Sequence, residues 1–208
     1  MFKYFFVTIT ERKADKIWFM GSSIVFWASQ RSKRDTKRWT VLTAQEGEWH
    51  GERGMGWSRF RPKLDTLLQK APPPQWLCVL LGSNDLGSKP LHELISCAQI
   101  NLNYVATVSP DTKIIWSDIL PRTQYRGAPS NARMEVARKS YNKKMRRFVK
   151  DMGGKCIKHP GIQWNNPEIF RRDGVHMNDL GNDVLNAGFQ DALVQFQCDK
   201  DMKEYPIA

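Results

Sequence analysis

The 208-residue sequence lacks the patterns that mark membrane, metal and disulfide-rich proteins. It contains no run of 18 or more apolar residues, so we expect no membrane span. Its four cysteines form no C-x-x-C pair, and its four histidines form no H-E-x-x-H pattern. These absences argue against a structural or catalytic metal. They also favour a reduced, intracellular protein of the cytoplasm or nucleus.

Two further motifs are missing, and acidic residues are scarce. Neither the G-x-S-x-G elbow of α/β-hydrolases nor the G-x-G-x-x-G nucleotide fingerprint occurs, so we expect no nucleotide cofactor and no cofactor of another kind. The chain has 21 acidic residues against 32 Lys and Arg, which gives a net charge of +11. This balance favours anionic surroundings such as nucleic acid, but it does not determine the fold.

Apolar runs alternate with segments of helical spacing along the chain, which is typical of a β-α repeat. Strand-like runs occur at 17–20, 39–43, 77–81, 112–116 and 155–157. Helical stripes occur at 24–30, 57–68, 91–105, 134–149 and 180–196. The order predicts an α/β protein, a three-layer α/β/α sandwich around a parallel sheet of about five strands. In such a sheet, ligands bind beyond the carboxyl ends of the strands.

One domain is expected for a chain of this length. We place it at residues 16–197, between a leader segment at 1–15 and a polar, frayed tail at 198–208. The apolar run at 1–7 is too short for a signal-peptide core, and no small-residue cleavage site follows it. A leader or an edge strand is therefore the simpler interpretation of the first residues.

Four polar residues in three short segments indicate nucleophilic chemistry. Ser23 follows the first strand-like run, Asn84 follows the run at 77–81, and Asp173 lies three residues before His176. A serine hydroxyl becomes nucleophilic when a histidine accepts its proton and a carboxylate holds that histidine. The Asn84 amide could donate a hydrogen bond to a developing oxyanion. Taken singly, the same residues also fit helix caps, a turn and a surface loop.

Together these segments resemble the four sequence blocks of the SGNH hydrolases, also called GDSL-type esterases. The matching stretches are Gly21-Ser22-Ser23-Ile24, Arg53-Gly54-Met55, Gly82-Ser83-Asn84-Asp85 and Asp173-x-x-His176. The resemblance implies a flavodoxin-like SGNH hydrolase fold with Ser23 as nucleophile, His176 as base and Asp173 as orienting acid. It also implies an oxyanion hole made by the backbone N–H groups of Ser23 and Gly54 and the side chain of Asn84. Gly51 and Gly56 compete with Gly54 for that role.

The sequence departs from the family pattern at one position. The family usually has an aspartate, which supports the local turn, where this chain has Ser22. The change puts catalytic efficiency in doubt but leaves the four named residues intact. The segments 116–122 and 173–182 further resemble a subgroup of such domains that occurs in vertebrate genomes, partly within proteins encoded by retrotransposons.

These observations predict a serine esterase that hydrolyses a small acyl ester without a cofactor. An acyltransferase with the same triad remains the alternative, because the sequence does not show whether water or an alcohol accepts the acyl group. The acyl chain, the alcohol and the oligomeric state also remain open.

A second function class comes from the basic segment 133–150. It holds eight basic residues and one acid, Glu135. The simpler interpretation is a solvated helix face, with the apolar stripe toward the sheet and the cations mainly outward. The alternative is a non-specific phosphate-binding patch, formed by Lys143, Lys144, Arg146 and Arg147, on a weakly active or inactive module that binds nucleic acid.

Overall fold

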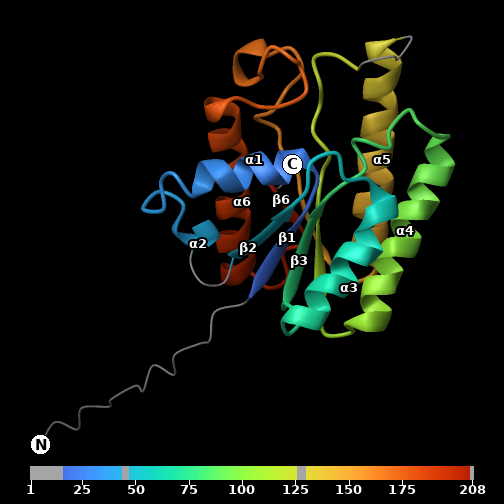
Figure 1. Cartoon of the computed structure of the whole chain (residues 1–208), viewed down its shortest axis with the longest axis vertical. Coiled ribbons are helices and arrows are strands. Elements are labelled where there is room, and N and C mark those ends of the chain that lie inside the picture. The colour runs from blue at the N-terminus through green and yellow to red at the C-terminus, as the bar shows by residue number, and fades with distance from the viewer. Residues whose placement is uncertain (1–15, 44–46, 126–129, 207–208) are drawn as a thin grey trace, which may run out of the picture.

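The computed structural model describes residues 16–43, 47–125 and 130–206, so the leader expected at 1–15 lies outside the described residues. The described chain forms one parallel sheet of six strands in the order β2-β1-β3-β4-β5-β6 (Figure 1). The α/β class and the parallel sheet predicted from the sequence are confirmed, with six strands in place of about five. The strands are β1 Ile17–Gly21, β2 Gly47–Gly51, β3 Trp76–Leu80, β4 Lys113–Ser117, β5 Lys155–Ile157 and β6 Glu204–Tyr205.

Helices cover both faces of this sheet, so the three-layer sandwich is also confirmed. Helices α1 and α6 pack on one face, and α3, α4 and α5 pack on the other (Figure 1). None of the helices in the described ranges has the length and hydropathy needed to cross a bilayer. The helices are α1 Ser23–Ser32, α2 Thr40–Thr43, α3 Phe60–Lys70, α4 Leu91–Val108, α5 Asn131–Asp151 and α6 Asp179–Cys198, with 3₁₀ turns η1 Trp57–Arg59 and η2 Pro167–Ile169.

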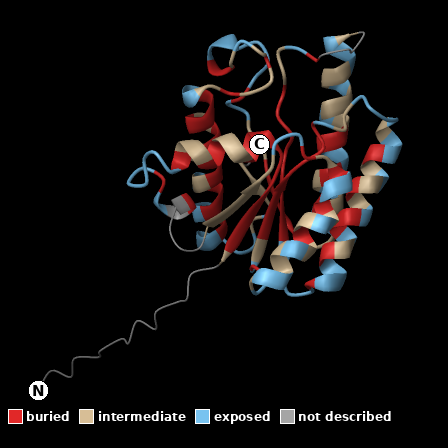
Figure 2. Ribbon diagram, in the orientation of Figure 1, coloured by how far each residue is buried: buried red, intermediate tan, exposed pale blue. Residues whose placement is uncertain are grey.

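The core lies in the central strands, because helices cover these strands from both sides. All five residues of β1 and the last four residues of β3 are buried, whereas β2 at the edge is half-buried throughout (Figure 2). Strands covered on both faces read as continuous apolar runs in the sequence, which explains why β1 and β3 were predictable. Trp18 of β1 and Trp116 of β4 are fully buried in this layer.

The strand predicted at 39–43 is wrong. Residues Thr40–Thr43 form the short helix α2, and the second strand is Gly47–Gly51. Trp39 and Leu42 are both buried and lie three residues apart, the spacing of one helix face. Their apolar side chains therefore serve the packing of this short helix beside α6. Gly51 is required in β2, because a Cβ there would lie 2.2 Å from the backbone nitrogen of Phe26 in α1.

The polar tail predicted from residue 198 also differs from the structure. Residues Glu204–Tyr205 form β6, which pairs with β5 and adds a sixth strand. The buried side chain of Lys155 fixes the connection from α6, because its Nζ donates to the carbonyl oxygens of Asp199, Lys200 and Met202. Residues 199–206 are therefore polar because they form an edge strand and supply the acceptors of a buried cation.

The order of the first five strands, 2-1-3-4-5, is the flavodoxin-like order. The order reverses at β1, whose neighbours are β2 and β3, and the crevice at such a reversal is where open α/β sheets bind ligands. Ser23 follows β1, and Asn84 lies in the loop after β3. The topology thus places two of the predicted site residues at this crevice.

Candidate active site

Three polar side chains from the two ends of the chain form a continuous hydrogen-bonded path. Oγ of Ser23 lies 2.9 Å from Nε2 of His176, and Nδ1 of the same ring lies 2.7 Å from Oδ2 of Asp173. Ser23 begins α1, directly after β1, whereas Asp173 and His176 lie in the loop between η2 and α6. The structure therefore brings together the three residues predicted as nucleophile, base and orienting acid.

The carboxylate of Asp173 is held in one orientation by its own loop. Its Oδ1 accepts hydrogen bonds from the backbone N–H groups of Val175 and His176, both at 2.9 Å, which leaves Oδ2 for the imidazole. Burial alone would raise the pKa of Asp173, but these hydrogen bonds outweigh it and lower the pKa to about 2. The turn requires Gly174, because its φ is +66° and a Cβ would lie 2.3 Å from Oγ1 of Thr123. An ionised Asp173 favours the tautomer with the proton on Nδ1, so Nε2 can accept the serine proton.

Ser23 also lies at a helix N-terminus, where backbone N–H groups lack acceptors within the helix. The first helical bond runs from the N–H of Phe26 to the carbonyl oxygen of Ser22, 3.2 Å away. The N–H of Ser23 is thus available to an anion, and the positive end of the helix dipole favours negative charge there. Ser22 is buried, and its Oγ has no hydrogen-bond partner among the described residues. Its hydroxyl therefore does not replace the support given by the family's aspartate.

The other two predicted oxyanion donors lie in the loops on either side of β1. The loop after β2 is fixed beside β1, because the N–H of Glu52 donates to the carbonyl oxygen of Gly21 at 2.9 Å. Nδ2 of Asn84, in the loop after β3, donates to the carbonyl oxygen of Met55 at 3.1 Å, one residue from Gly54. Gly54 and Asn84 therefore lie close together in space.

The structure separates the three competing glycines. Gly51 is the last residue of β2, and Gly56 packs against the carboxylate of Asp85. Gly54 lies in the open part of the loop with a φ of +67°, and its N–H donates to no other described residue. Neither Gly54 nor Asn84 bonds to Ser23 within the described ranges, so their role as oxyanion donors stays a prediction.

Arg122 is a site residue whose role the sequence does not reveal. Its Nη2 donates to Oδ1 of Asn84 at 3.0 Å. The next residue, Thr123, donates its N–H to the carbonyl oxygen of Gly174 at 2.9 Å, so this loop is joined to the loop of Asp173 and His176. The only local signal is its place five residues after the end of β4, where ligand-binding loops of this topology begin.

Searches with the sequence find no match to a family model or to a curated protein. The fold, however, matches solved structures. A GDSL-like lipase from Bacteroides thetaiotaomicron superposes with a TM-score of 0.60 at 18% identity, covering 87% of this chain and 88% of that one. A carbohydrate esterase family 3 structure from Talaromyces cellulolyticus gives 0.65 at 17% identity, covering 88% and 98%. An acetyl xylan esterase, AlAXEase, gives 0.64 at 19% identity, covering 86% and 99%.

The chain has the SGNH hydrolase fold. The fold implied by the resemblance in sequence is thereby confirmed. The resemblance to the vertebrate and retrotransposon subgroup stays a prediction.

A stack of two arginines and a tryptophan joins the loops of this SGNH fold across α1. The guanidinium of Arg53, beside Gly54, lies 5.0 Å from the ring centroid of Trp27, and that of Arg171 lies 4.0 Å from the same centroid. Arg171 also bonds to the His176 loop, because its N–H donates to the carbonyl oxygen of His176 at 2.7 Å. Trp27 therefore links the loop after β2 to the loop of the catalytic histidine candidate.

A second serine–histidine pair lies nearby but lacks the features of a nucleophile. Oγ of Ser117 is 2.7 Å from Nε2 of His159. Ser117 is fully buried, and burial lowers the pKa of His159 to about 3. No described carboxylate bonds to the ring of His159. The pair therefore gives two buried polar groups a hydrogen-bond partner, but it lacks the orienting acid that His176 has in Asp173.

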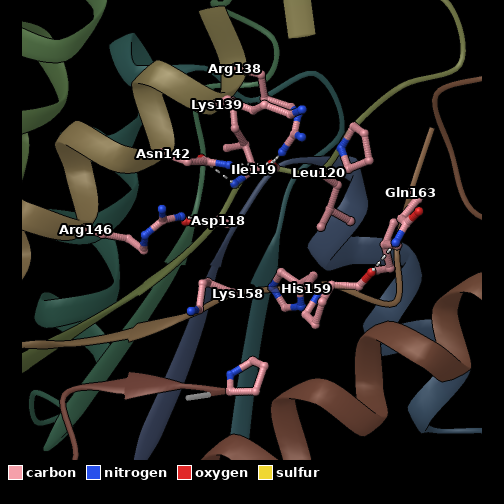
Figure 3. Close-up of a pocket in the computed structure, with 14 residues that line it drawn as sticks. Asp118, Ile119, Leu120, Arg138, Lys139, Asn142, Arg146, Lys158, His159 and Gln163 are labelled. Carbon is pink, nitrogen blue, oxygen red and sulfur yellow. Dashed lines mark hydrogen bonds and ion pairs between the residues drawn. The ribbon is translucent and has the colours of Figure 1, made fainter. Parts of the chain in front are cut away.

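A pocket of about 480 Å³ lies between the loops after β4 and β5, against α5 (Figure 3). Ser23, Asp173 and His176 do not line it. Its cations are largely engaged, because Arg146 pairs with Asp118 and Lys158 pairs with Glu204. Burial raises the pKa of Asp118 to about 6, although Arg146 opposes this shift. The pocket is therefore separate from the candidate triad.

The basic helix α5 only partly follows the sequence prediction. Tyr141, Met145 and Val149 are buried, and six of the eight cations are exposed. Arg146, named in the possible phosphate patch, points inward instead and pairs with Asp118. Arg138 also points inward and pairs with Glu135. The exposed cations are Arg133, Lys139, Lys143, Lys144, Arg147 and Lys150.

Proposed function

We propose that this chain is a serine esterase that hydrolyses a small carboxylic ester. The observation that carries the proposal is the unbroken path from Asp173 through His176 to Ser23, with distances of 2.7 and 2.9 Å. This path ends on a serine at a helix N-terminus, in the topological crevice where such folds bind ligands.

In the proposed reaction, Oγ of Ser23 attacks the ester carbonyl carbon while Nε2 of His176 accepts its proton. The tetrahedral oxyanion accepts hydrogen bonds from the N–H groups of Ser23 and Gly54 and from the side-chain amide of Asn84. His176 then gives its proton to the departing alcohol. A water molecule, deprotonated by His176, attacks the acyl-enzyme. The bond to Oγ of Ser23 then breaks, His176 returns the proton to this oxygen, and the carboxylic acid is released.

Labelling with a fluorophosphonate probe tests the nucleophile directly. We expect covalent labelling at Ser23, located by peptide mapping, and its loss in Ser23→Ala. Turnover of nitrophenyl esters should fall at least about 10³-fold in Ser23→Ala and His176→Ala, because triad members act as a unit. Ser117→Ala is the matched control, since it removes the other serine–histidine pair and should keep both labelling and turnover. Full turnover in Ser23→Ala would refute the proposal.

The substrate class follows from a panel of esters. Because two of the structural neighbours are an acetyl xylan esterase and a carbohydrate esterase, acetyl esters are the first substrates to try. Nitrophenyl esters of increasing acyl length then measure the size of the acyl site. Turnover with an added alcohol shows whether the acyl group goes to water or to another acceptor.

The exposed face of α5 supports a second candidate function, sequence-independent binding of nucleic acid. Lys143, Lys144 and Arg147 all lie exposed on α5, where they can contact phosphates without reading base sequence. Anisotropy of labelled single- and double-stranded oligonucleotides at two salt concentrations measures such binding. Changing these three residues to glutamate should abolish it and leave ester turnover unchanged.

The matched control reverses three exposed lysines elsewhere. Binding that survives reversal on α5, or is lost equally in the control, would exclude α5 as the contact. Arg146 is left unchanged in both variants, because its loss would leave Asp118 buried without its partner. The control positions are Lys33, Lys37 and Lys70.

A further inference from the structure

Arg122 reaches the candidate oxyanion donor from a loop that is fixed on the triad side of the molecule. Thr123 bonds through its N–H to Gly174, and Tyr125 bonds through its N–H to Oδ1 of Asn131. These contacts hold the backbone that directly follows Arg122. Its half-buried guanidinium is therefore directed by a constrained loop when it meets Asn84.

The contacts of Asn84 allow only one orientation of its amide. Arg122 has hydrogen-bond donors and no acceptor, so the atom facing it at 3.0 Å must be the amide oxygen. The backbone carbonyl of Met55 has only acceptor sites, so the atom facing it at 3.1 Å must be the amide nitrogen. An amide nitrogen carries two hydrogens, and no other described residue accepts one from Nδ2. One N–H of Asn84 is thus left for a ligand.

The charge of Arg122 is also not neutralised within the described chain. None of the ion pairs between described residues includes Arg122, and burial lowers the pKa of its guanidinium from the usual value. The charges of Tyr125 and Asp173 act in the opposite direction on this pKa but do not outweigh burial. A guanidinium remains cationic after such a shift. A cation bonded to the amide oxygen polarises the amide and strengthens donation from its nitrogen.

We propose that Arg122 is a positioning residue, which fixes and polarises the Asn84 amide so that its free N–H faces the developing oxyanion. This inference rests on the esterase function proposed above. In this proposal Arg122 does not touch the substrate oxygen. It sets the orientation and the donor strength of Asn84, which does.

The kinetic test is a double-mutant cycle on a short nitrophenyl ester. Arg122→Met should lower kcat about 10- to 100-fold, the range for losing a charge-assisted hydrogen bond, with KM changed less than about threefold. In an Asn84→Ala background, the same change should cost less than about threefold, because the amide is already gone. Arg122→Lys should recover part of the lost kcat. An equal loss in both backgrounds, or a rise in KM alone, would overturn the proposal.

The matched control is Arg61→Met. Arg61 is also half-buried, donates to one oxygen, the Ile100 carbonyl, and stacks on one tyrosine, Tyr104. It lies on α3, away from the triad, so its loss should leave kcat unchanged. A matching loss of kcat in Arg61→Met would show that removing any such arginine has this effect, which contradicts a positioning role.

An independent readout does not need ester turnover. Relaxation of the Asn84 side-chain ¹⁵N, assigned by its absence in Asn84→Ala, reports how firmly the amide is held. The order parameter of this amide should fall in Arg122→Met and stay constant in Arg61→Met. Such a fall in a protein without esterase activity would refute the proposed function but still show that Arg122 holds the Asn84 amide in place. An unchanged order parameter would refute the positioning role in an active enzyme.

Discussion

Replacing Asp173 by asparagine should lower activity more than replacing it by alanine, whereas the alanine variant should lose more stability. Oδ1 of Asp173 accepts two backbone N–H groups, and Oδ2 faces Nδ1 of His176. In Asp173→Asn the amide oxygen must stay on the two N–H donors, so the NH₂ group turns toward Nδ1. The imidazole then takes the tautomer with its proton on Nε2, facing Ser23, and cannot accept the serine proton.

The magnitudes follow from what each variant keeps. We expect kcat to fall about 10⁴-fold in Asp173→Asn, the size of effect known for a wrong tautomer in serine hydrolases. Asp173→Ala should cost less, about 10³-fold, because the side chain it removes is 31% exposed and water can reach Nδ1. The alanine variant, however, loses both acceptors of the loop. Its stability should drop by ~1–2 kcal/mol, or about 2–8 °C in Tm, whereas the asparagine variant should unfold like the wild type.

The assays are steady-state hydrolysis of a nitrophenyl ester and thermal unfolding of the same preparations. Nitrogen-15 shifts of the imidazole of His176 then report the tautomer directly. An asparagine variant that is more active than the alanine variant would refute the reasoning. Equal Tm values for the two variants would show that Oδ1 does not hold the loop.

Three further outcomes are expected. Asn84→Ala should lower kcat about 10²–10³-fold with little change in KM, and a pure rise in KM would mean that Asn84 binds only the ground state. Ser22→Ala should leave the free energy of unfolding unchanged or raise it by ~1 kcal/mol, because the buried hydroxyl has no described hydrogen-bond partner. Urea unfolding measures this, and a clear loss of stability would mean that the hydroxyl does form a hydrogen bond. The folded protein keeps His159 neutral down to a pKa of about 3, whereas the unfolded chain protonates near the ordinary value. The stability from this residue is therefore present above pH ~6.5 and lost as the pH falls toward 3, so Tm should drop between pH 7 and 4.5 less steeply in His159→Gln than in the wild type.

The strands that the sequence predicts correctly are those whose two faces are both covered. Residues 77–81 form an apolar run because helices bury β3 from both sides. The edge strand β2 gives no such signal, because Gly47 and Gly51 are required there by close contacts to Leu42 and α1. The neighbouring segment 39–43 has the apolar pattern of a strand, although residues 40–43 form a helix. Tertiary contacts, not local preference, decide between these two segments.

The candidate triad was predictable because each member lies in a short segment after a strand or in a tight loop. Arg122 was not, since its partner Asn84 is 38 residues away and the contact depends on how two loops meet. The inward direction of Arg138 and Arg146 had a local signal. Both lie four residues from the buried Asn142, and residues four apart share a helix face. The apolar residues alone did not indicate that this polar face of the helix also points inward.

The last residues of the chain determine where it can be shortened. Cutting after Gln197 would follow the boundary that composition suggests, but it would remove the three carbonyl oxygens that hold the ammonium of Lys155. A buried cation would then have no partner from that segment, and β5 would become an open edge able to pair with another copy. A protein truncated there should aggregate, whereas one that ends after Pro206 keeps both the acceptors and the covering strand.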